Sequence, residues 1–371
     1  MFEVFSRINQ NHEVKIFCGY YSPVNYATEK NLEIEGAITR IGTNGLIPGY
    51  GPEFLTCVAE SIRRISKFKP DAVVVNNGYE HVGLLSRRCD GVVIPYVHGT
   101  DWYRSVNLLN KETLWQMPHF NKLVSLASSS TAAVKIYNQF ENIGLMRTRT
   151  LLALRRCKIN VCVSDYVSRF LKHIDSKINT KVVHHGVDHT VFKPTFEDEE
   201  YLLTITRIYP NKNPMLAVKA VKETKHRLLI DGNMERGVES YEKYCQELLS
   251  TKGENVRMTL DPSQETLIHD LQACSLFLSP AKNEGVPLVI LEAMACGKFT
   301  IGHNTGGQAE YLNGNGITCG DDPDEWRKHI NRLMNDRAER IILGKHAHAA
   351  SMKYTWEKTA KEIQETITEC A

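Results

Sequence analysis

Residues 284–297 read Glu284-Gly-Val-Pro-Leu-Val-Ile-Leu-Glu292-Ala-Met-Ala-Cys-Gly297, and this stretch decides how we interpret the whole chain. Pro287 suits the first turn of a helix and Gly297 suits the residue after its last turn, so we expect a helix over about 287–296. The first backbone amides of a helix have no partner inside it and carry partial positive charge, which makes a helix start a ready phosphate site. An unpaired glutamate is rarely buried, so the two carboxylates that bracket this helix start need an explanation.

The residues before the helix place Glu284 in a loop. Leu276–Ser279 is a short apolar run that predicts a central strand, and Pro280 ends that strand because proline donates no ladder hydrogen bond. Glu292 then lies about one and a half turns inside the helix. A carboxylate only accepts hydrogen bonds, so both side chains suit the hydroxyl groups of a sugar or a ribose. On local physics alone, an equally good alternative is that both cap the helix or pair with arginine or lysine.

Composition excludes several classes of protein. With 371 residues the chain is long enough for two domains, and 45 Lys and Arg against 43 Asp and Glu are too balanced for a nucleic-acid-binding protein. The 10 cysteines include no Cys-x-x-Cys pair, which favours reduced thiols and a cytoplasmic location. His184-His185 and His346-Ala-His348 lack partners in register, so we expect no metal site. No apolar run spans a membrane, and the first residues lack a signal-peptide pattern.

Short apolar segments alternate with helical patterns, which predicts parallel α/β sheets. Helices are expected at Glu53–Lys67, Leu216–Thr224 and Gln264–Cys274. A break near 189–200, with Pro194 and the acidic run Glu197–Glu200, predicts a linker between two doubly wound domains. The expected strands are Glu13–Cys18, Ala72–Asn76, Val92–Val97, Val161–Ser164, Lys181–His184, Tyr201–Thr206, Arg227–Asp231, Val256–Thr259, Leu276–Ser279 and Phe299–Gly302.

Polar residues follow several of these strands, at the sheet edge where ligands bind in such folds. Arg207 and then Lys212 follow Tyr201–Thr206, and Lys212 precedes a helix start at Asn213-Pro214. An arginine and a lysine beside helix amides suit a diphosphate, although a solvated loop with two surface cations is the alternative.

Two further strand ends carry candidate site residues. Gly306-Gly307 precedes a helical pattern and lets the backbone approach a ligand closely, unless it is a plain turn. His98 follows Val92–Val97 and could contact a sugar or phosphate oxygen, or be a hydrogen-bonded structural histidine. Asp101 either orients His98 or caps the next helix.

Taken together, these residues resemble a known family. Glu284 to Gly297 and Thr305-Gly-Gly-Gln-Ala-Glu310 look like the donor-site signature of the family 4 retaining glycosyltransferases, also called glycosyl transferases group 1. His185-Gly-Val-Asp188 with Phe192-Lys-Pro194 resembles the family's entry into its second domain, with His185 in place of the usual asparagine. Tyr354-Thr-Trp356 and the helix after it resemble the segment that returns to the first domain. The resemblance is strongest over about 180–312.

The resemblance implies the α/β GT-B fold, with two Rossmann-like domains that face each other. We expect an acceptor-side domain over 1–189, a donor-binding domain over 190–350, and a C-terminal helix at about 354–371 that packs on the first domain. It also implies that a sugar passes from a nucleotide-diphosphate sugar to a hydroxyl of a glycan, lipid-linked or small-molecule acceptor. The donor is a co-substrate, and neither a cofactor nor a metal is expected.

The family also implies roles for individual residues. His98 and Glu284 would contact the donor sugar, Glu292 the ribose, and Arg207 and Lys212 the diphosphate, whose charge they stabilise as it departs. Catalytic roles therefore fall to His98, Arg207, Lys212 and Glu284. The donor-binding set would further include Gly285, Val286, Pro287, Leu288, Glu292, Gly306 and Gly307.

The beginning of the chain departs from the family pattern. Relatives start with an apolar strand and a Gly-rich loop, whereas this sequence starts at Met1-Phe-Glu-Val-Phe-Ser6, inside the expected first helix. We therefore expect an N-terminal domain without its first strand, with an exposed sheet edge and impaired activity unless another segment fills the gap.

Several alternatives stay open. A binding protein without transfer activity, an epimerase and a phosphorylase would share the same donor half-site. A nicotinamide dehydrogenase is disfavoured because no Gly-x-Gly-x-x-Gly follows a strand. Leu145–Lys158 carries five basic residues among leucines and could rest peripherally on the inner face of a membrane, although packing of its leucines on the sheet is favoured.

Overall fold

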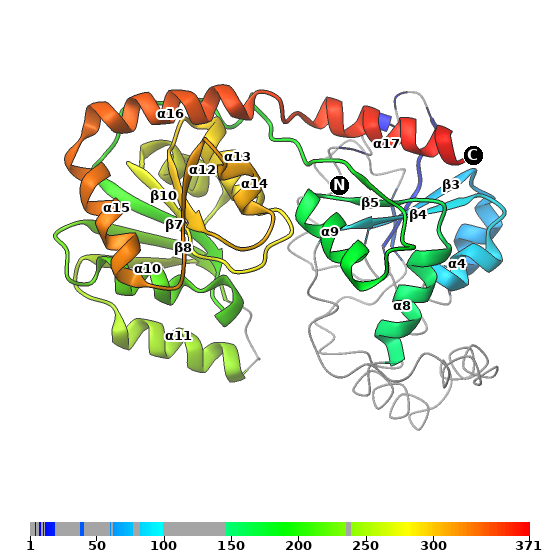
Figure 1. Cartoon of the computed structure of the whole chain (residues 1–371), viewed down its shortest axis with the longest axis horizontal. Helices are drawn as coiled ribbons and strands as arrows, with labels where there is room; N and C mark the ends of the chain where they lie inside the picture. Colours follow the sequence, from blue (N-terminus) through cyan, green and yellow to red (C-terminus); the bar gives the residue numbers. More distant parts are fainter. Residues whose placement is uncertain are drawn as a thin grey trace. The chain divides into compact units, whose positions relative to one another are not determined.

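The structure is a computed structural model that describes residues 4, 7, 8, 10, 12–18, 38–40, 60, 62–76, 82–98, 145–234 and 239–371. The chain divides into two compact units (Figure 1). The first unit comprises Met1–Cys162, Ser168–Val183 and Ala360–Ala371, and the second comprises Val163–Val167 and His184–Thr359.

The first unit contains parallel strands only, as far as it is described. β1 (Ile16–Cys18) pairs with β2 (Ile38–Arg40), and a separate four-stranded sheet has the order β3-β4-β5-β6. The sheet consists of β3 (Ala72–Val75), β4 (Val92–Val97), β5 (Asn160–Cys162) and β6 (Thr180–Val182). Its helices include α4 (Val82–Arg88) and α8 (Leu145–Arg156). Helix α9 (Asp165–Ile174) begins in the second unit and ends in the first, as does α17 (Trp356–Cys370).

The second unit is a six-stranded parallel sheet with the order β12-β11-β10-β7-β8-β9. Its strands are β7 (Tyr201–Arg207), β8 (Arg227–Asn233), β9 (Val256–Leu260), β10 (Leu276–Ser279), β11 (Thr300–His303) and β12 (Gly316–Cys319). Between them lie η3 (Pro210–Lys212), α10 (Pro214–Val221), α11 (Glu239–Thr251), α12 (Gln264–Ala273), α13 (Leu288–Ala295), α14 (Gln308–Leu312), α15 (Pro323–Asn335) and α16 (Arg337–Ser351). The α/β organisation expected from the sequence is therefore confirmed.

Alternating side chains of these strands fill a core on each face of the sheet. Leu202 of β7 packs with residues of α10, α11 and α15, whereas its neighbour Leu203 packs with residues of α12, α13, α14 and α16. Figure 1 shows the same two layers of helices on opposite sides of the sheet. Successive strand residues point to opposite faces, so a strand covered on both sides needs adjacent apolar residues, such as Leu202-Leu203 of β7 and Leu276–Leu278 of β10.

The strand order reverses between β7 and β10. The chain runs from β7 outward through β8 to β9, then returns to β10 on the other side of β7 and continues outward to β12. Helices that follow the two central strands therefore lie on opposite faces and leave a crevice at the carboxyl ends of those strands, where ligands bind in doubly wound sheets. The residues after β7 and β10 are the ones that this topology brings to such a crevice.

Most predicted elements are present, with small shifts at their ends. The helix expected over 287–296 is α13, which begins at Leu288 with Pro287 as the residue before it. The sequence analysis missed β2 and β12, which are short strands. Of the helix expected at Glu53–Lys67, only the part from residue 60 onward is described, and it is helical. We predicted that the first domain lacks its first strand, and this prediction falls outside the described residues.

The acidic run Glu197–Glu200, which we expected in a linker, is part of the second unit. Asp198 and Arg340 form a buried ion pair at 3.1 Å, and Ser275 Oγ donates to the same carboxylate at 2.7 Å. Lys298 Nζ donates to the carbonyl oxygen of Glu197 at 3.1 Å. A negatively charged segment is therefore fixed here by buried cations.

Helix α8 turns its apolar side chains into the first unit. Leu151 and Leu154 are buried, while Arg155 and Arg156 are exposed. This is the arrangement expected if the helix packs on the sheet.

None of the described helices is both long enough and apolar enough to cross a membrane. The cysteines at 89, 157, 162, 245, 274, 296, 319 and 370 are buried free thiols.

Candidate functional site

The segment Ala281–Gly285, which follows β10 and carries Glu284, is tied to its surroundings at every residue. Gln308 Nε2 donates to the carbonyl oxygen of Ala281 at 2.6 Å, and the Lys282 amide donates to Asn211 O in the turn after β7 at 3.1 Å. The amides of Asn283 and Gly307 donate to Thr305 Oγ1 at 3.2 Å and to Glu284 O at 2.7 Å. Ser164 Oγ donates to Gly285 O at 2.8 Å. Hydrogen bonds within the protein thus hold each residue of this loop.

Gly306 and Gly307 are glycines because this loop packs directly on them. A Cβ atom on Gly307 would lie 1.8 Å from the carbonyl oxygen of Gly285, and one on Gly306 would lie 2.5 Å from that of Glu284. Gly306 also has a φ of +84°, which L side chains rarely adopt. The two predicted site segments therefore meet through their backbones. Gly307 precedes α14, as the sequence predicted.

Lys212 and Glu284 form an ion pair in which Nζ lies 2.5 Å from Oε1. Their side chains are only 16% and 19% exposed, so the pair is largely shielded from water. Lys212 ends the short 3-10 helix η3, and Asn213 then takes a left-handed conformation with φ of 54° before α10 begins at Pro214. The expected helix start after Lys212 is present, although the Asn213 side chain makes no capping hydrogen bond. A cation and an acceptor thus lie together at the switch point of the sheet.

Arg207 is the exposed last residue of β7. Its guanidinium lies over the ring of Tyr209, with Cζ 5.0 Å from the ring centroid, and Tyr209 stacks on Tyr241 with centroids 5.4 Å apart. A guanidinium held against an aromatic face keeps its N–H groups available at its edge. Arg207 can therefore offer several donors to an anion at this end of the sheet.

Glu292 lies on α13 and is mostly buried, and the described residues supply no hydrogen-bond or ion-pair partner for its carboxylate. Burial raises the pKa of Glu292 to about 7. A carboxyl group that is desolvated without a compensating partner is a marker of a functional site. At the start of the same helix, Pro287 restricts the backbone but has no N–H group to donate. The backbone amides at this helix start are therefore those of Val286 and Leu288.

His98 belongs to the first unit and follows β4, as the sequence predicted. Its Nε2 is hydrogen-bonded to Oδ1 of Asn76, at the end of the neighbouring strand, and burial lowers its pKa to about 4. The imidazole is therefore neutral near pH 7, and its hydrogen bond to an amide fits both alternatives, a sugar contact and a structural histidine. Asp101 lies outside the described residues.

The sequence analysis overlooked a group of side chains behind the loop. Gln308 is fully buried and also accepts from Ser279 Oγ at 3.0 Å, which joins the end of β10 to the start of α14. His303, at the end of β11, is hydrogen-bonded to Thr305 and to Asp321. Nothing in the local sequence around His303 indicates Asp321 as its partner, because Asp321 follows the next strand along the chain, β12.

His184, for which the sequence offered no carboxylate partners, lies near Asp165 and Glu310. One ligand atom from each falls within 4.8 Å of the other two. The Glu310 carboxylate, however, already accepts hydrogen bonds from the amides of Asp165 and Tyr166 at the start of α9. A carboxylate at a helix start is favoured by the helix dipole, so we interpret this group as an anchor for that helix.

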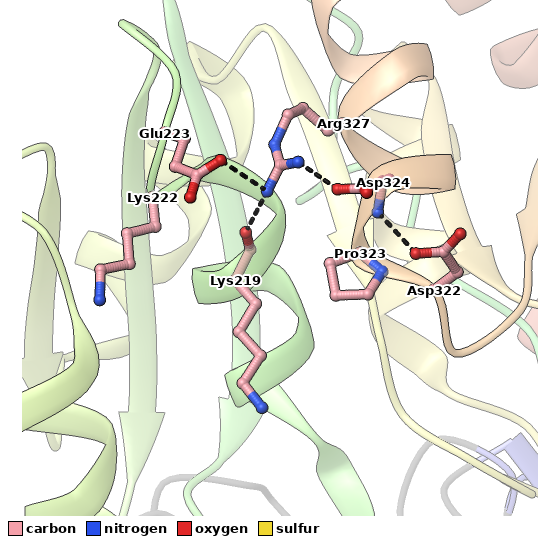
Figure 2. Close-up of a pocket in the computed structure, with 7 residues that line it drawn as sticks. All are labelled: Lys219, Lys222, Glu223, Asp322, Pro323, Asp324 and Arg327. Atoms are coloured by element: carbon pink, nitrogen blue, oxygen red, sulfur yellow. Dashed lines mark hydrogen bonds and ion pairs between the residues drawn. The ribbon is translucent and has the colours of Figure 1, made fainter.

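A separate hollow of about 450 Å³ lies between α10 and α15 (Figure 2). At its centre Arg327 donates to the carbonyl oxygen of Lys219 at 2.9 Å and pairs with Asp324 and Glu223. Arg327 also donates to Ala220 O at 3.1 Å, so it caps the end of α10. The hollow is therefore explained by a helix-end contact and carries none of the predicted site residues.

Comparison with known proteins identifies the family. A model described as Glycosyltransferase Family 4 matches residues 7–191, and one described as Glycosyl transferases group 1 matches residues 188–350. The chain belongs to the family 4, group 1 glycosyltransferases. Within this family it is 24% identical over 214 residues to an uncharacterized glycosyltransferase of Methanocaldococcus jannaschii, a match that covers 56% of this chain and 59% of that protein.

Another relative within the glycosyltransferases is a D-inositol 3-phosphate glycosyltransferase of Corynebacterium urealyticum. It is 33% identical over 113 residues, which are 30% of this chain and 27% of that protein. The matched stretches thus span between about a quarter and three fifths of these relatives.

Similar solved structures confirm the GT-B fold. Sucrose-phosphate synthase from Thermosynechococcus elongatus superposes with a TM-score of 0.71 at 17% identity, over 90% of this chain and 82% of that one. Anabaena HepE, in a structure with UDP and glucose, superposes with a TM-score of 0.70 at 16% identity, over 99% and 94% of the two chains. Both expectations drawn from the donor-site signature, the family and the fold, are therefore confirmed.

Proposed function

We propose that this protein transfers a sugar, with retention of configuration, from a nucleotide-diphosphate sugar to a hydroxyl group of a glycan, lipid-linked or small-molecule acceptor. The observation that carries the proposal is the Lys212–Glu284 pair at the carboxyl ends of the two central strands. A lone structural ion pair would fit almost anywhere on a surface. This one lies at the switch point of the sheet, in a loop held by five separate contacts.

Arg207 and Lys212 are the residues that we assign to the diphosphate. As the bond between the anomeric carbon and the diphosphate breaks, negative charge grows on the leaving oxygen. A guanidinium donates through a planar fork, whereas an ammonium group has three donors. Lys212 can therefore keep its bond to Glu284 and still donate to a phosphate oxygen. Charge stabilisation of this kind is worth about 100-fold to 1000-fold per donor in enzymes.

Glu284 is the residue that we assign to the sugar hydroxyls. The carboxylate has two oxygens, and the ion pair with Lys212 uses one of them, Oε1. The other oxygen can accept from a hydroxyl group of the donor sugar. Because the Glu284 and Gly285 carbonyl oxygens are both occupied by protein donors, the side chain is aimed before the donor arrives. A pre-aimed acceptor loses little entropy on binding.

Glu292 is the residue that we assign to the ribose. Two adjacent ribose hydroxyls can donate to one carboxylate, and such donors favour its ionised form. They would thereby offset the burial that raises the pKa of the free side chain to about 7. HepE structures contain UDP and UDP-glucose, which makes uridine diphosphate sugars the first donors to test.

For retention we propose attack from the same face as the leaving group. The acceptor oxygen bonds to the anomeric carbon as the bond to the diphosphate breaks, and a diphosphate oxygen takes the acceptor proton. His98, neutral near pH 7, would hydrogen-bond the donor sugar without adding charge. Arg207 and Lys212 supply the positive charge that this reaction needs, so we propose that it needs no metal ion. We propose a cytoplasmic site for the reaction.

A panel of labelled uridine, guanosine and adenosine diphosphate sugars tests the proposal. The wild-type protein should release nucleoside diphosphate and form a glycoside of unchanged anomeric configuration with a mixture of hydroxyl acceptors. Binding without turnover would instead make it a sugar-nucleotide-binding protein. Release of free epimerised sugar would indicate an epimerase, and dependence on inorganic phosphate would indicate a phosphorylase.

A further inference from the structure

A row of hydrogen bonds runs from Asp321 to the residue before Glu284. His303, the last residue of β11, is 3% exposed. Its Nε2 lies 3.1 Å from Asp321 Oδ1, and its Nδ1 lies 2.9 Å from Thr305 Oγ1. Thr305 Oγ1 in turn accepts the backbone amide of Asn283 at 3.2 Å. Four residues from three separate loops and strand ends thus share one line of contacts.

The direction of the hydrogen bonds in this row can be assigned for a neutral His303. Lys282 and His303 lower the pKa of Asp321, so its carboxylate is ionised and can only accept. The imidazole must then donate from Nε2, and in its neutral form it accepts at Nδ1. The Thr305 hydroxyl therefore donates its proton to His303, which leaves its oxygen lone pairs for the Asn283 amide. With His303 neutral, each donor in the row therefore meets an acceptor.

Asn283 is the residue at which this row matters. Its φ of 55° lies in the left-handed region, which asparagine adopts more readily than most other residues with a side chain. Two contacts of the loop hold it in this conformation. The hydrogen bond from the Asn283 amide to Thr305 Oγ1 holds it from one side, and the Lys282–Asp321 ion pair holds the preceding residue. The direction in which the chain enters Glu284 follows from this conformation.

We propose that His303 is a positioning residue for Glu284 and acts on it through Thr305 and Asn283. The proposal rests on the function proposed above, in which Glu284 accepts hydroxyls of the donor sugar. The hydrogen bonds of His303 go to Asp321 and Thr305 rather than to Glu284 itself. It orients the Thr305 hydroxyl, so that the oxygen faces the Asn283 amide and the loop keeps the conformation that aims Glu284. A displacement of about 1 Å is enough to weaken such a site.

Two substitutions of Thr305 separate this hydrogen bond from packing. Thr305→Val keeps the branched shape but can neither accept from Asn283 nor donate to His303, whereas Thr305→Ser keeps the hydroxyl and loses a methyl group. Backbone amide exchange, followed by mass spectrometry on peptides that contain residues 281–285, reports the loop directly. We expect exchange about tenfold faster in Thr305→Val, the equivalent of one hydrogen bond, and near-wild-type exchange in Thr305→Ser.

A third variant tests the role of the imidazole. His303→Leu should speed loop exchange about as much as Thr305→Val does, and the double variant should be no faster than either single one, because both break the same row. Turnover of the donor that the wild type accepts should fall at least tenfold in kcat in Thr305→Val and His303→Leu, and recover in Thr305→Ser.

The outcomes separate this proposal from the proposed function. Equal loop exchange in Thr305→Val and Thr305→Ser would overturn the positioning role, as would additive effects in the double variant or unchanged turnover despite faster exchange. A wild type that turns over no sugar nucleotide would refute the proposed function. The exchange measurements would then decide alone: faster exchange in Thr305→Val and His303→Leu supports the row, and unchanged exchange overturns it.

Discussion

Lys212 Nζ lies 2.5 Å from Glu284 Oε1, so the turn after β7 and the loop after β10 are joined by one partly shielded ion pair. The two residues are 72 positions apart in the sequence, and the strand order brings them together. Within this pair, each side chain neutralises the charge of the other. When a diphosphate sugar binds, the same two groups can meet its opposite ends, the anion and the hydroxyls.

This arrangement predicts the effect of removing the cation. Lys212→Met should lower kcat about 100-fold, because one donor to the leaving diphosphate is lost and Glu284 is left without its partner. Lys212→Arg should retain part of the activity, since it keeps the charge but changes the geometry. Lys222→Met, at the exposed residue that follows α10, is the matched control. Equal turnover in Lys212→Met and Lys222→Met would contradict the assignment.

Glu292 predicts a dependence of stability on pH. Its pKa is near 4.5 in the unfolded chain and about 7 in the folded protein, so the folded state holds the proton more tightly. Stability that is fully present below pH 4.5 is therefore lost as pH rises toward 7, by roughly 3 kcal/mol at most. In Glu292→Gln the free energy of unfolding, measured in urea, should differ less between pH 5 and pH 8 than in the wild type. The same substitution should weaken donor binding. A parallel decline in both proteins would show that Glu292 is not the group responsible.

Gly306→Ala and Gly314→Ala form a matched pair. Both glycines have a positive φ, +84° and +74°, but a Cβ on Gly306 would meet the Glu284 backbone at 2.5 Å, whereas one on Gly314 would meet nothing within 4 Å. Both substitutions cost about 1 kcal/mol for the conformation. Only Gly306→Ala should also displace the loop and reduce turnover, by at least tenfold. Thermal unfolding and kcat measure the two effects separately, and similar kcat values for the pair would argue against close packing at the loop.

The Asp198–Arg340 pair predicts a large effect on stability away from the site. Its side chains are 6% and 5% exposed, so Arg340→Leu leaves a buried carboxylate without a partner and should cost about 3–5 kcal/mol. Arg332→Leu, on the preceding helix, breaks an exposed pair with Glu339 and should cost at most about 1 kcal/mol. Urea unfolding of the two variants tests this difference. Equal losses would mean that burial of the Asp198 pair has no energetic consequence.

The sequence predicted those parts of the site that depend on local rules. Pro287 and Gly297 bounded a helix, and Gly306-Gly307 marked a turn before the next one. Arg207, Lys212 and Glu284 were found because polar residues follow apolar strands in succession. Periodicity could not show that β10 returns beside β7, which is what pairs Lys212 with Glu284. Resemblance to the family implied only that both residues bind the same donor.

The parts that the sequence did not reveal depend on tertiary partners. Gln308 and His303 are polar residues in an apolar surrounding. Only the folded sheet shows that Gln308 donates to Ala281 and that His303 is hydrogen-bonded to Thr305. The acidic run 197–200 was interpreted as a linker because its partners Lys298 and Arg340 lie far along the chain. Short strands such as β12 escape detection because four residues carry little pattern.

The most direct test of the account is turnover of sugar nucleotides by the wild-type protein and by Glu284→Ala, measured side by side with their melting temperatures. We predict that one nucleotide-diphosphate sugar raises the melting temperature of the wild type and is consumed by it. Glu284→Ala should keep the fold and lose at least 99% of the turnover, about the effect of one lost transition-state contact. Undiminished turnover in a folded Glu284→Ala protein would contradict the account.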